Sequence, residues 1–278
     1  MQVTREFKFT TEVTASVRTD TGRVREANED AGRHTAPRDR DMLLRKGTLT
    51  VVADGMGGHA SGEIASQMAI EAIGDVYYGE TEMSAAAALE AAIQAANERI
   101  YQKSLTDENY YGMGTTIVAL VVLHDTAVAA HVGDSRLYRL RAGRMEMLTV
   151  DHSQVMEMVR HGVISMEEAR HHDDKNVILR AVGTQPAVEA EISAPFAVEP
   201  GDEFLLCSDG LSDMLGDEEI AAVWTSRRDI HAACEHLIAE ANARGGHDNV
   251  TVGIVRVAPL AGEPPPNAVR ATREIEIA

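Results

Sequence analysis

Residues 54–59, Asp-Gly-Met-Gly-Gly-His, constrain the fold of this chain more than any other stretch. Directly before them, residues 48–53 form an apolar, β-branched run that predicts a buried strand. Directly after them, from Ser61 to Val76, apolar residues recur at helical spacing and predict a helix. A carboxylate therefore follows a buried strand, and the glycines let backbone groups approach whatever that carboxylate binds.

Three further aspartates lie in short loops beside apolar runs, namely Asp134 in Gly-Asp-Ser-Arg, Asp209 in Ser-Asp-Gly and Asp248 in Gly-Gly-His-Asp-Asn-Val. Glu29 and Asp30 add a fifth acidic position. Any single Asp-Gly pair is most often an ordinary surface turn. If these loops converge, their carboxylates repel one another strongly unless cations lie among them.

The types of side chain in these loops indicate the chemistry. Hard oxygen ligands without sulfur favour magnesium or manganese over zinc or copper. Two such ions close together activate a water molecule and neutralise a phosphoryl group during in-line displacement. Arg25 carries a planar guanidinium of the kind that pairs with phosphate oxygens.

Charge and composition exclude several other classes. The formal net charge of -18 argues against binding to nucleic acid or to an anionic membrane. Cys207 and Cys234 lack the spacing of a zinc site and fit reduced, buried thiols. The charged N-terminus is no secretion signal, and the longest apolar run, residues 117–123, is too short to cross a bilayer. We therefore expect a soluble, cytoplasmic protein. We also expect a monomer.

The order of the expected elements indicates the fold class. Strands come in hairpin-like groups joined by short turns, and helices are collected between the groups, whereas residues 36–46 read as an exposed loop. This order predicts an α+β fold with antiparallel sheets and outer helices rather than a doubly wound parallel sheet. The expected strands are residues 12–18, 48–53, 115–123, 126–132, 137–141, 203–207 and 250–257, and the expected helices begin near residues 61, 84, 217 and 230.

The motifs, taken together and in this order, resemble the metal-dependent protein phosphatases of type 2C, and the bacterial branch fits best. The segments that carry the resemblance are residues 25–30, 54–58, 114–116, 133–136, 149–153, 208–210 and 248–249. The resemblance implies a four-layer α-β-β-α sandwich, with one catalytic domain over residues 1–257 and a flap at about residues 155–177. Residues 258–278, which include three consecutive prolines, read as a flexible C-terminal extension.

The resemblance also implies a centre of two manganese or magnesium ions. Asp54 would bridge the two ions, and Asp209 and Asp248 would complete one site. The carbonyl of Gly55 would serve the other site, with Glu29 nearby. Asp134 would hold a third, weaker ion together with Asp209.

Other positions follow from the same resemblance. Arg25 would bind the substrate phosphate, while Asp30 and Asn249 would lie beside the metal ligands. Gly162, Val163 and Ile164 would belong to the flap that influences substrate choice.

One departure concerns the general acid. Animal members carry a histidine directly after the Asp-Gly pair, and this chain has Met56 there. His59 is close in sequence, but an exposed or structural role suits it equally well, so the general acid stays unassigned.

The resemblance implies hydrolysis of phosphoserine and phosphothreonine in proteins by metal-activated water, opposing a bacterial serine/threonine kinase. A phosphoprotein-binding module with the same fold and little turnover is the alternative from another class. A metal phosphohydrolase acting on a small molecule is a third reading. Phosphate release from a phosphopeptide, compared with release from small phosphate esters, separates the last two.

Overall fold

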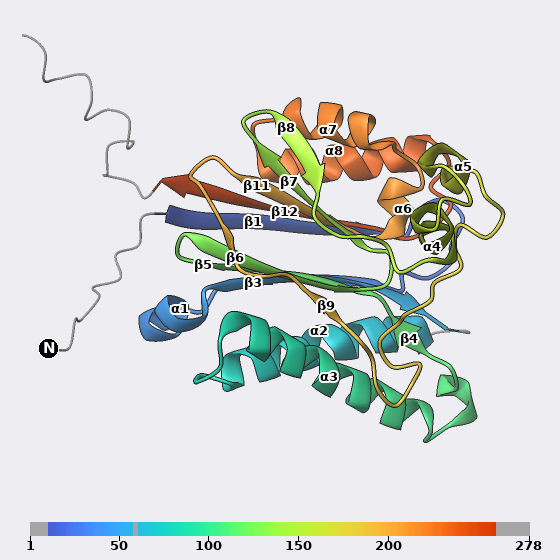
Figure 1. Ribbon diagram of the computed structural model, residues 1–278, viewed down its shortest axis with the longest axis horizontal. Helices are drawn as coiled ribbons and strands as arrows, with labels where there is room; N and C mark the ends of the chain where they lie inside the picture. Colours follow the sequence, from blue (N-terminus) through green and yellow to red (C-terminus); the bar gives the residue numbers. More distant parts are fainter. Residues whose placement is uncertain (1–10, 58–60, 260–278) are drawn as a thin grey trace, which may run out of the picture.

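The computed structural model describes residues 11–57 and 61–259, which form four layers in the order helix, sheet, sheet, helix (Figure 1). This arrangement confirms the expected α-β-β-α sandwich. His59 and residues 260–278 of the expected extension lie outside the described residues. None of the described helices is both long enough and apolar enough to span a membrane.

Both sheets are antiparallel throughout their described pairings. The first sheet has the order β1 (Thr11–Asp20), β12 (Val250–Pro259), β11 (Glu203–Cys207), β7 (Arg136–Arg141) and β8 (Arg144–Met147). The second has the order β10 (Phe196–Ala197), β6 (Thr126–Val132), β5 (Ile117–Leu123), β3 (Thr48–Met56) and β2 (Asp30–Thr35). Two short strands extend it, since β4 (Gly114–Thr115) pairs with β3 and β9 (Glu191–Ile192) pairs with β6.

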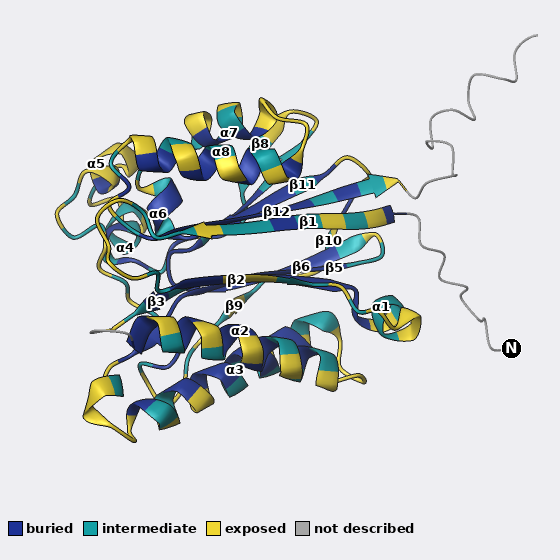
Figure 2. Ribbon diagram, turned by 180° about the vertical axis from the view of Figure 1, so that it is seen from behind, coloured by how far each residue is buried: buried dark blue, intermediate teal, exposed yellow. Residues whose placement is uncertain are grey.

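Helices cover the outer face of each sheet. The long helices α2 (Ser61–Gly79) and α3 (Ala85–Ser104) lie against the second sheet, and α7 (Asp217–Thr225) and α8 (Ile230–Ala243) lie against the first (Figure 1). Shorter helices are α1 (Arg40–Lys46), η1 (Glu108–Tyr110), α4 (Gln154–Arg160), α5 (Met166–Arg170) and α6 (Asp209–Ser212). Figure 2 shows exposed residues along the outer sides of α2 and α3, as the helical spacing of their apolar residues predicts.

The hydrophobic core has three clusters, one beneath each helix layer and one between the sheets. Between the sheets, aliphatic side chains such as Val52, Val118 and Leu206 are completely buried. Beneath α2 and α3, small residues such as Ala69 and Ala92 let the helices approach the sheet closely. Aliphatic and alanine packing thus replaces the aromatic residues that this chain largely lacks.

The prediction of an exposed loop at residues 36–46 is wrong, because this segment contains helix α1. Asp39 caps this helix by accepting a hydrogen bond from the backbone amide of Met42 at 2.8 Å. Lys46, at its end, is only 1% exposed, and its Nζ donates to the carbonyl of Met83 at 3.2 Å. A helix of seven residues crowded with charges gives no clear period, so tertiary contacts decide it.

The register of the strands brings the acidic loops to one end of the sandwich. In the second sheet, Asp30 of β2 lies opposite Asp54 of β3. In the first sheet, Cys207 at the end of β11 lies opposite both Val252 of β12 and Arg136 of β7. The loops before β12, before β7 and after β11 therefore meet at the same edge.

Candidate metal centre

The four aspartates singled out in the sequence come from four elements. Asp54 lies within β3, which continues two residues beyond it, and Asp209 begins α6 directly after β11. Asp134 lies in the turn between β6 and β7, and Asp248 precedes β12. Asp134 is 8% exposed, and the other three are half-buried, so each carboxylate is partly withdrawn from water.

These carboxylates share one strongly negative environment. Burial raises the pKa of Asp54 well above its ordinary range, and the charges of Asp30, Asp209, Asp134 and Asp248 raise it further. Burial raises the pKa of Asp209 in the same way, with Asp134 among the neighbours that add to it. Mutual effects on pKa mean that the carboxylates lie close enough to repel one another.

Burial also raises the pKa of Asp134, to about 7, and the nearby charge of Asp151 adds to the effect. Burial therefore disfavours the charged form of this carboxylate. A cation placed beside it would favour the ionised form, because opposite charge lowers the pKa of a carboxyl group.

The backbone around Asp54 is held on both sides. Its amide donates to Thr116 Oγ1 at 3.1 Å, and its carbonyl accepts the Thr116 amide at 2.8 Å and the Thr115 hydroxyl at 2.9 Å. Thr116 Oγ1 also lies 2.7 Å from Ser135 Oγ, the residue after Asp134. The loops that carry Asp54 and Asp134 are therefore linked through one buried threonine.

Asp30 is buried and lies opposite Asp54 in the register of the second sheet. Its Oδ2 accepts a hydrogen bond from Ser208 Oγ at 2.7 Å, and that hydroxyl in turn accepts the amide of Thr251 at 2.9 Å. Burial raises the pKa of Asp30 to about 6. Asp30 thus connects the second sheet to the residue preceding Asp209 in the first.

Asn249 organises the segment that leads to Glu29. Its Oδ1 accepts the amide of Glu29 at 2.8 Å, and its Nδ2 donates to the carbonyls of Thr21 and Ala27 at 2.9 and 2.8 Å. Asn249 also donates its own amide to Asp248 Oδ1 at 2.8 Å. The side chain of Asn249 therefore positions Glu29, and its backbone amide positions Asp248.

Two glycines allow close approach next to Asp54. A Cβ at Gly55 would lie 2.1 Å from the carbonyl oxygen of Gly62 and 2.4 Å from that of Glu29. A Cβ at Gly62 would lie 2.7 to 2.9 Å from the carboxylate of Glu29. The start of α2 thus packs against Glu29 only because position 62 has no side chain.

Arg25 reaches the centre from an exposed loop. Its Nη2 donates to Asp248 Oδ2 at 2.7 Å, and this hydrogen bond raises the pKa of the guanidinium. The contact places a fixed positive charge at the rim of the acidic cluster. A planar guanidinium there is suited to the oxygens of a phosphate.

The donor set fits divalent cations. Asp209 Oδ1 and Asp30 Oδ1 are buried without a hydrogen-bond partner within residues 11–57 and 61–259. Buried carboxylate oxygens are costly to leave unpaired, and the charges of further carboxylates act on both residues. Asp54, Asp209, Asp248, Asp134, Glu29 and the Gly55 carbonyl supply oxygen only, which suits manganese or magnesium.

A cavity of about 480 Å³ opens beside this centre and contains Asp134 and Asp209 in its wall. Helices α4 and α5 of the expected flap form its other side, through residues such as Met156 and Ala169. Gly162, Val163 and Ile164 do not line it, since they form the turn between α4 and α5, where Val163 is 66% exposed.

The flap is held over the cavity by ion pairs. Lys175 Nζ lies 2.6 Å from Asp213 Oδ2, and Arg170 Nη2 lies 3.5 Å from Asp217 Oδ1. Both carboxylates lie outside the flap, near α6 and α7. The contacts of the flap with the domain come from α5 and the residues that follow it, rather than from the three residues singled out in the sequence.

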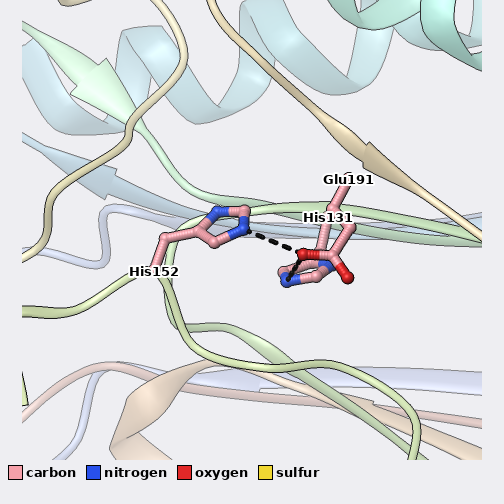
Figure 3. A group of neighbouring side chains, drawn as sticks. All are labelled: His131, His152 and Glu191. Atoms are coloured by element: carbon pink, nitrogen blue, oxygen red, sulfur yellow. Dashed lines mark hydrogen bonds and ion pairs between the residues drawn. The ribbon is translucent and has the colours of Figure 1, made fainter. Parts of the chain in front are cut away.

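The sequence reading missed a cluster of His131, His152 and Glu191 (Figure 3). In this cluster the two imidazole rings stack with their centroids 4.5 Å apart. Within the described residues it is the one group of three such side chains whose ligand atoms lie within 4.8 Å of one another. Ser153, the residue after His152, caps α4 by accepting a hydrogen bond from the backbone amide of Met156. No signal in the sequence pairs residues so far apart.

Comparisons with known proteins identify the family of this chain. The model of the protein phosphatase 2C family matches residues 26–243. A serine/threonine phosphatase of Listeria innocua is 39% identical over 246 residues, which cover 87% of this chain and 94% of that protein.

Solved structures give the same result. The serine/threonine phosphatase PstP of Mycobacterium tuberculosis superposes with a TM-score of 0.79 at 35% identity, covering 88% of this chain and 99% of that one. The PstP catalytic domain in complex with two manganese ions gives a TM-score of 0.78 at 35% identity, with 90% and 100% of the two chains covered.

Proposed function

This chain belongs to the protein phosphatase 2C family, and on that premise we propose that it hydrolyses phosphoserine and phosphothreonine in proteins. It is a metal-dependent enzyme, and its relative PstP has been solved with two manganese ions. The observation that carries the proposal is the convergence of Asp54, Asp209 and Asp248, with an unpaired buried oxygen on Asp209.

We assign the metal-holding roles to residues whose geometry supports them. Asp54, Asp209 and Asp248 would hold two ions, with the Gly55 carbonyl and Glu29, and Asp134 would contribute to a third. When bound, manganese or magnesium supplies an activated water and neutralises charge on the phosphoryl group.

The remaining residues bind and orient. Arg25 would pair with the phosphate oxygens, held near the centre by its contact with Asp248. Asp30 and Asn249 keep the acidic loops in register through the hydrogen bonds described above. Met56 has no proton to donate, so the leaving oxygen receives its proton from another source.

We further propose that the substrates are a serine/threonine kinase and its phosphorylated targets, and that the enzyme acts as a cytoplasmic monomer. The support is the family of the chain together with its net charge of -18, which disfavours nucleic acid and anionic lipid as partners. Comparing kcat/KM for the phosphorylated kinase with kcat/KM for a phosphopeptide would identify the better substrate.

The deciding experiment is phosphate release from a phosphothreonine peptide with manganese, with magnesium and with a chelator. We expect metal-dependent turnover that falls at least about a hundredfold in Asp209→Asn, because a metal ligand is lost. Asp125→Asn, an exposed carboxylate in the β5–β6 turn, is the matched control and should change nothing. Manganese binding without turnover would instead indicate a phosphoprotein-binding module, and faster turnover of small esters would indicate a small-molecule phosphohydrolase.

A second variant tests the role of Arg25. Arg25→Ala should raise KM for the phosphopeptide about tenfold or more, since a charge-assisted contact to phosphate is lost. Manganese affinity, measured by calorimetry, should stay within a few-fold of wild type. An unchanged KM would remove Arg25 from the phosphate site.

A further inference from the structure

The cluster of His131, His152 and Glu191 resembles a metal site, but its hydrogen bonds assign the ring protons otherwise. The amide of Gly133 donates to His152 Nδ1 at 3.2 Å, so the proton of the neutral ring resides on Nε2. His152 Nε2 faces Glu191 Oε2 at 3.4 Å, and His131 Nε2 donates to the carbonyl of Val150 at 2.8 Å. Neither Nε2 therefore offers a lone pair to a cation in this arrangement.

The cluster instead fastens Gly133 at two points. The amide of Gly133 donates to the ring of His152, and the amide of His152 donates to the carbonyl of Gly133 at 2.8 Å. The side chain of His152 is only 8% exposed, so water does not readily replace the ring nitrogen as acceptor. Burial, with the neighbouring His131, lowers the pKa of His152 and keeps the ring neutral.

Gly133 is the residue directly before Asp134, and its backbone conformation is unusual. Its φ is +103°, a region that side chains rarely adopt, and a Cβ there would lie 2.6 Å from the side chain of Thr116. Thr116 is the residue that accepts the amide of Asp54. The two-point contact with His152 thus holds the turn that directly precedes Asp134 and that packs against Thr116, the residue bound to Asp54.

His152 also lies at the base of the flap, where the segment that enters the flap pairs with the segment that leaves it. Its carbonyl accepts the amide of Leu179 at 2.7 Å, and the next residues continue the contact, with the Gln154 amide donating to Val177 at 2.9 Å. An isolated bridge joins Ser153 to Ile178. One residue therefore connects the base of the flap to the turn that carries Asp134.

We propose that His152 is a positioning residue of the phosphatase, whose Nδ1 holds the Gly133–Asp134 turn and the base of the flap in the geometry needed for turnover. The inference rests on the proposed function, because it assigns His152 a role in phosphatase turnover. His152 acts through the Gly133–Asp134 turn and the flap, and it does not contact substrate. Its essential atom is Nδ1, and the contact of Nε2 with Glu191 is secondary.

Two substitutions of His152 distinguish the role of Nδ1 from the role of Nε2. Asn places its Oδ1 where His152 has Nδ1, so His152→Asn retains an acceptor for the Gly133 amide. His152→Gln places its polar group near the position of Nε2 and leaves that amide without an acceptor. Both variants lose the stacking with His131, so the difference between them isolates the Nδ1 contact.

We expect His152→Asn to keep kcat/KM within about threefold of wild type, and His152→Gln to lose about tenfold, the factor that one hydrogen bond represents. Glu191→Gln should stay within about twofold, because its amide oxygen still accepts from Nε2. Equal losses in the Asn and Gln variants, or no loss in either, would overturn the proposal.

Tryptic cleavage within the flap gives a readout that does not depend on activity. Arg160 and Arg170 lie in the flap and Arg180 lies just beyond it, with side chains 40 to 69% exposed, so the rate of cleavage by trypsin at these sites reports opening of the flap. Cleavage there should accelerate about tenfold in His152→Gln and not in His152→Asn, at equal melting temperature. If activity instead follows melting temperature across the variants, the role of His152 is merely structural and the proposal fails. If the wild-type protein releases no phosphate, the proposed function fails, but the cleavage test of the flap still applies.

Discussion

Replacing Asp30 by asparagine should stabilise the metal-free protein, although Asp30 belongs to the acidic centre. Asp30 is 4% exposed, lies opposite Asp54, and has one oxygen without a partner among the described residues. Burial raises its pKa from the ordinary 3.8 to about 6. Asparagine keeps the shape of the side chain and an acceptor for Ser208, but it removes the charge.

The magnitude follows from proton linkage. A carboxyl group with a raised folded-state pKa binds more protons folded than unfolded, so stability falls as pH rises from about 4 to about 6. Above that window the full penalty of about 3 kcal/mol applies, and at pH 5 about half of it remains. Asp30→Asn should therefore raise the metal-free melting temperature by several degrees at pH 8, and by about half as much at pH 5.

Thermal unfolding with a chelator at pH 8 and pH 5 measures this directly, with Asp125→Asn as the exposed control. Manganese should shrink or reverse the gain, because a cation favours the ionised carboxylate. A gain of the same size at both pH values would refute the electrostatic reasoning. So would a variant less stable than wild type at pH 8 without metal.

Two further substitutions test the packing around the centre and away from it. Gly62→Ala would press a Cβ against the Glu29 carboxylate, so manganese affinity measured by calorimetry should fall about tenfold; unchanged affinity would remove Glu29 from the metal ligands. Asp202 is 1% exposed and accepts two hydrogen bonds from Arg141, at 2.7 and 2.6 Å, at the opposite end of β7 from the centre. Asp202→Asn should cost about 2 kcal/mol in urea unfolding and leave kcat unchanged, and a matching loss of turnover would contradict this separation.

The residues of the acidic loops could be identified from the sequence because their chemistry is local. A single aspartate next to glycine is most often an ordinary turn, but several such loops in a fixed order are far more specific. The long helices were also predictable, since their apolar residues recur over many turns. Short elements such as α1 and β2 were not, because seven or six residues with mixed charge give no period that outweighs tertiary contacts.

The environment of those residues was decided only by the tertiary structure. The register that sets Asp30 opposite Asp54 comes from pairing between strands. The raised pKa values of Asp30 and Asp54 come from burial at the end of the sandwich where the acidic loops lie. The same holds for His152, whose partners Gly133 and Glu191 are 19 and 39 residues away in sequence. The sequence by itself determined which functional groups the chain carries; folding determined their neighbours, because hydrogen bonds and electrostatic interactions depend on distance in space.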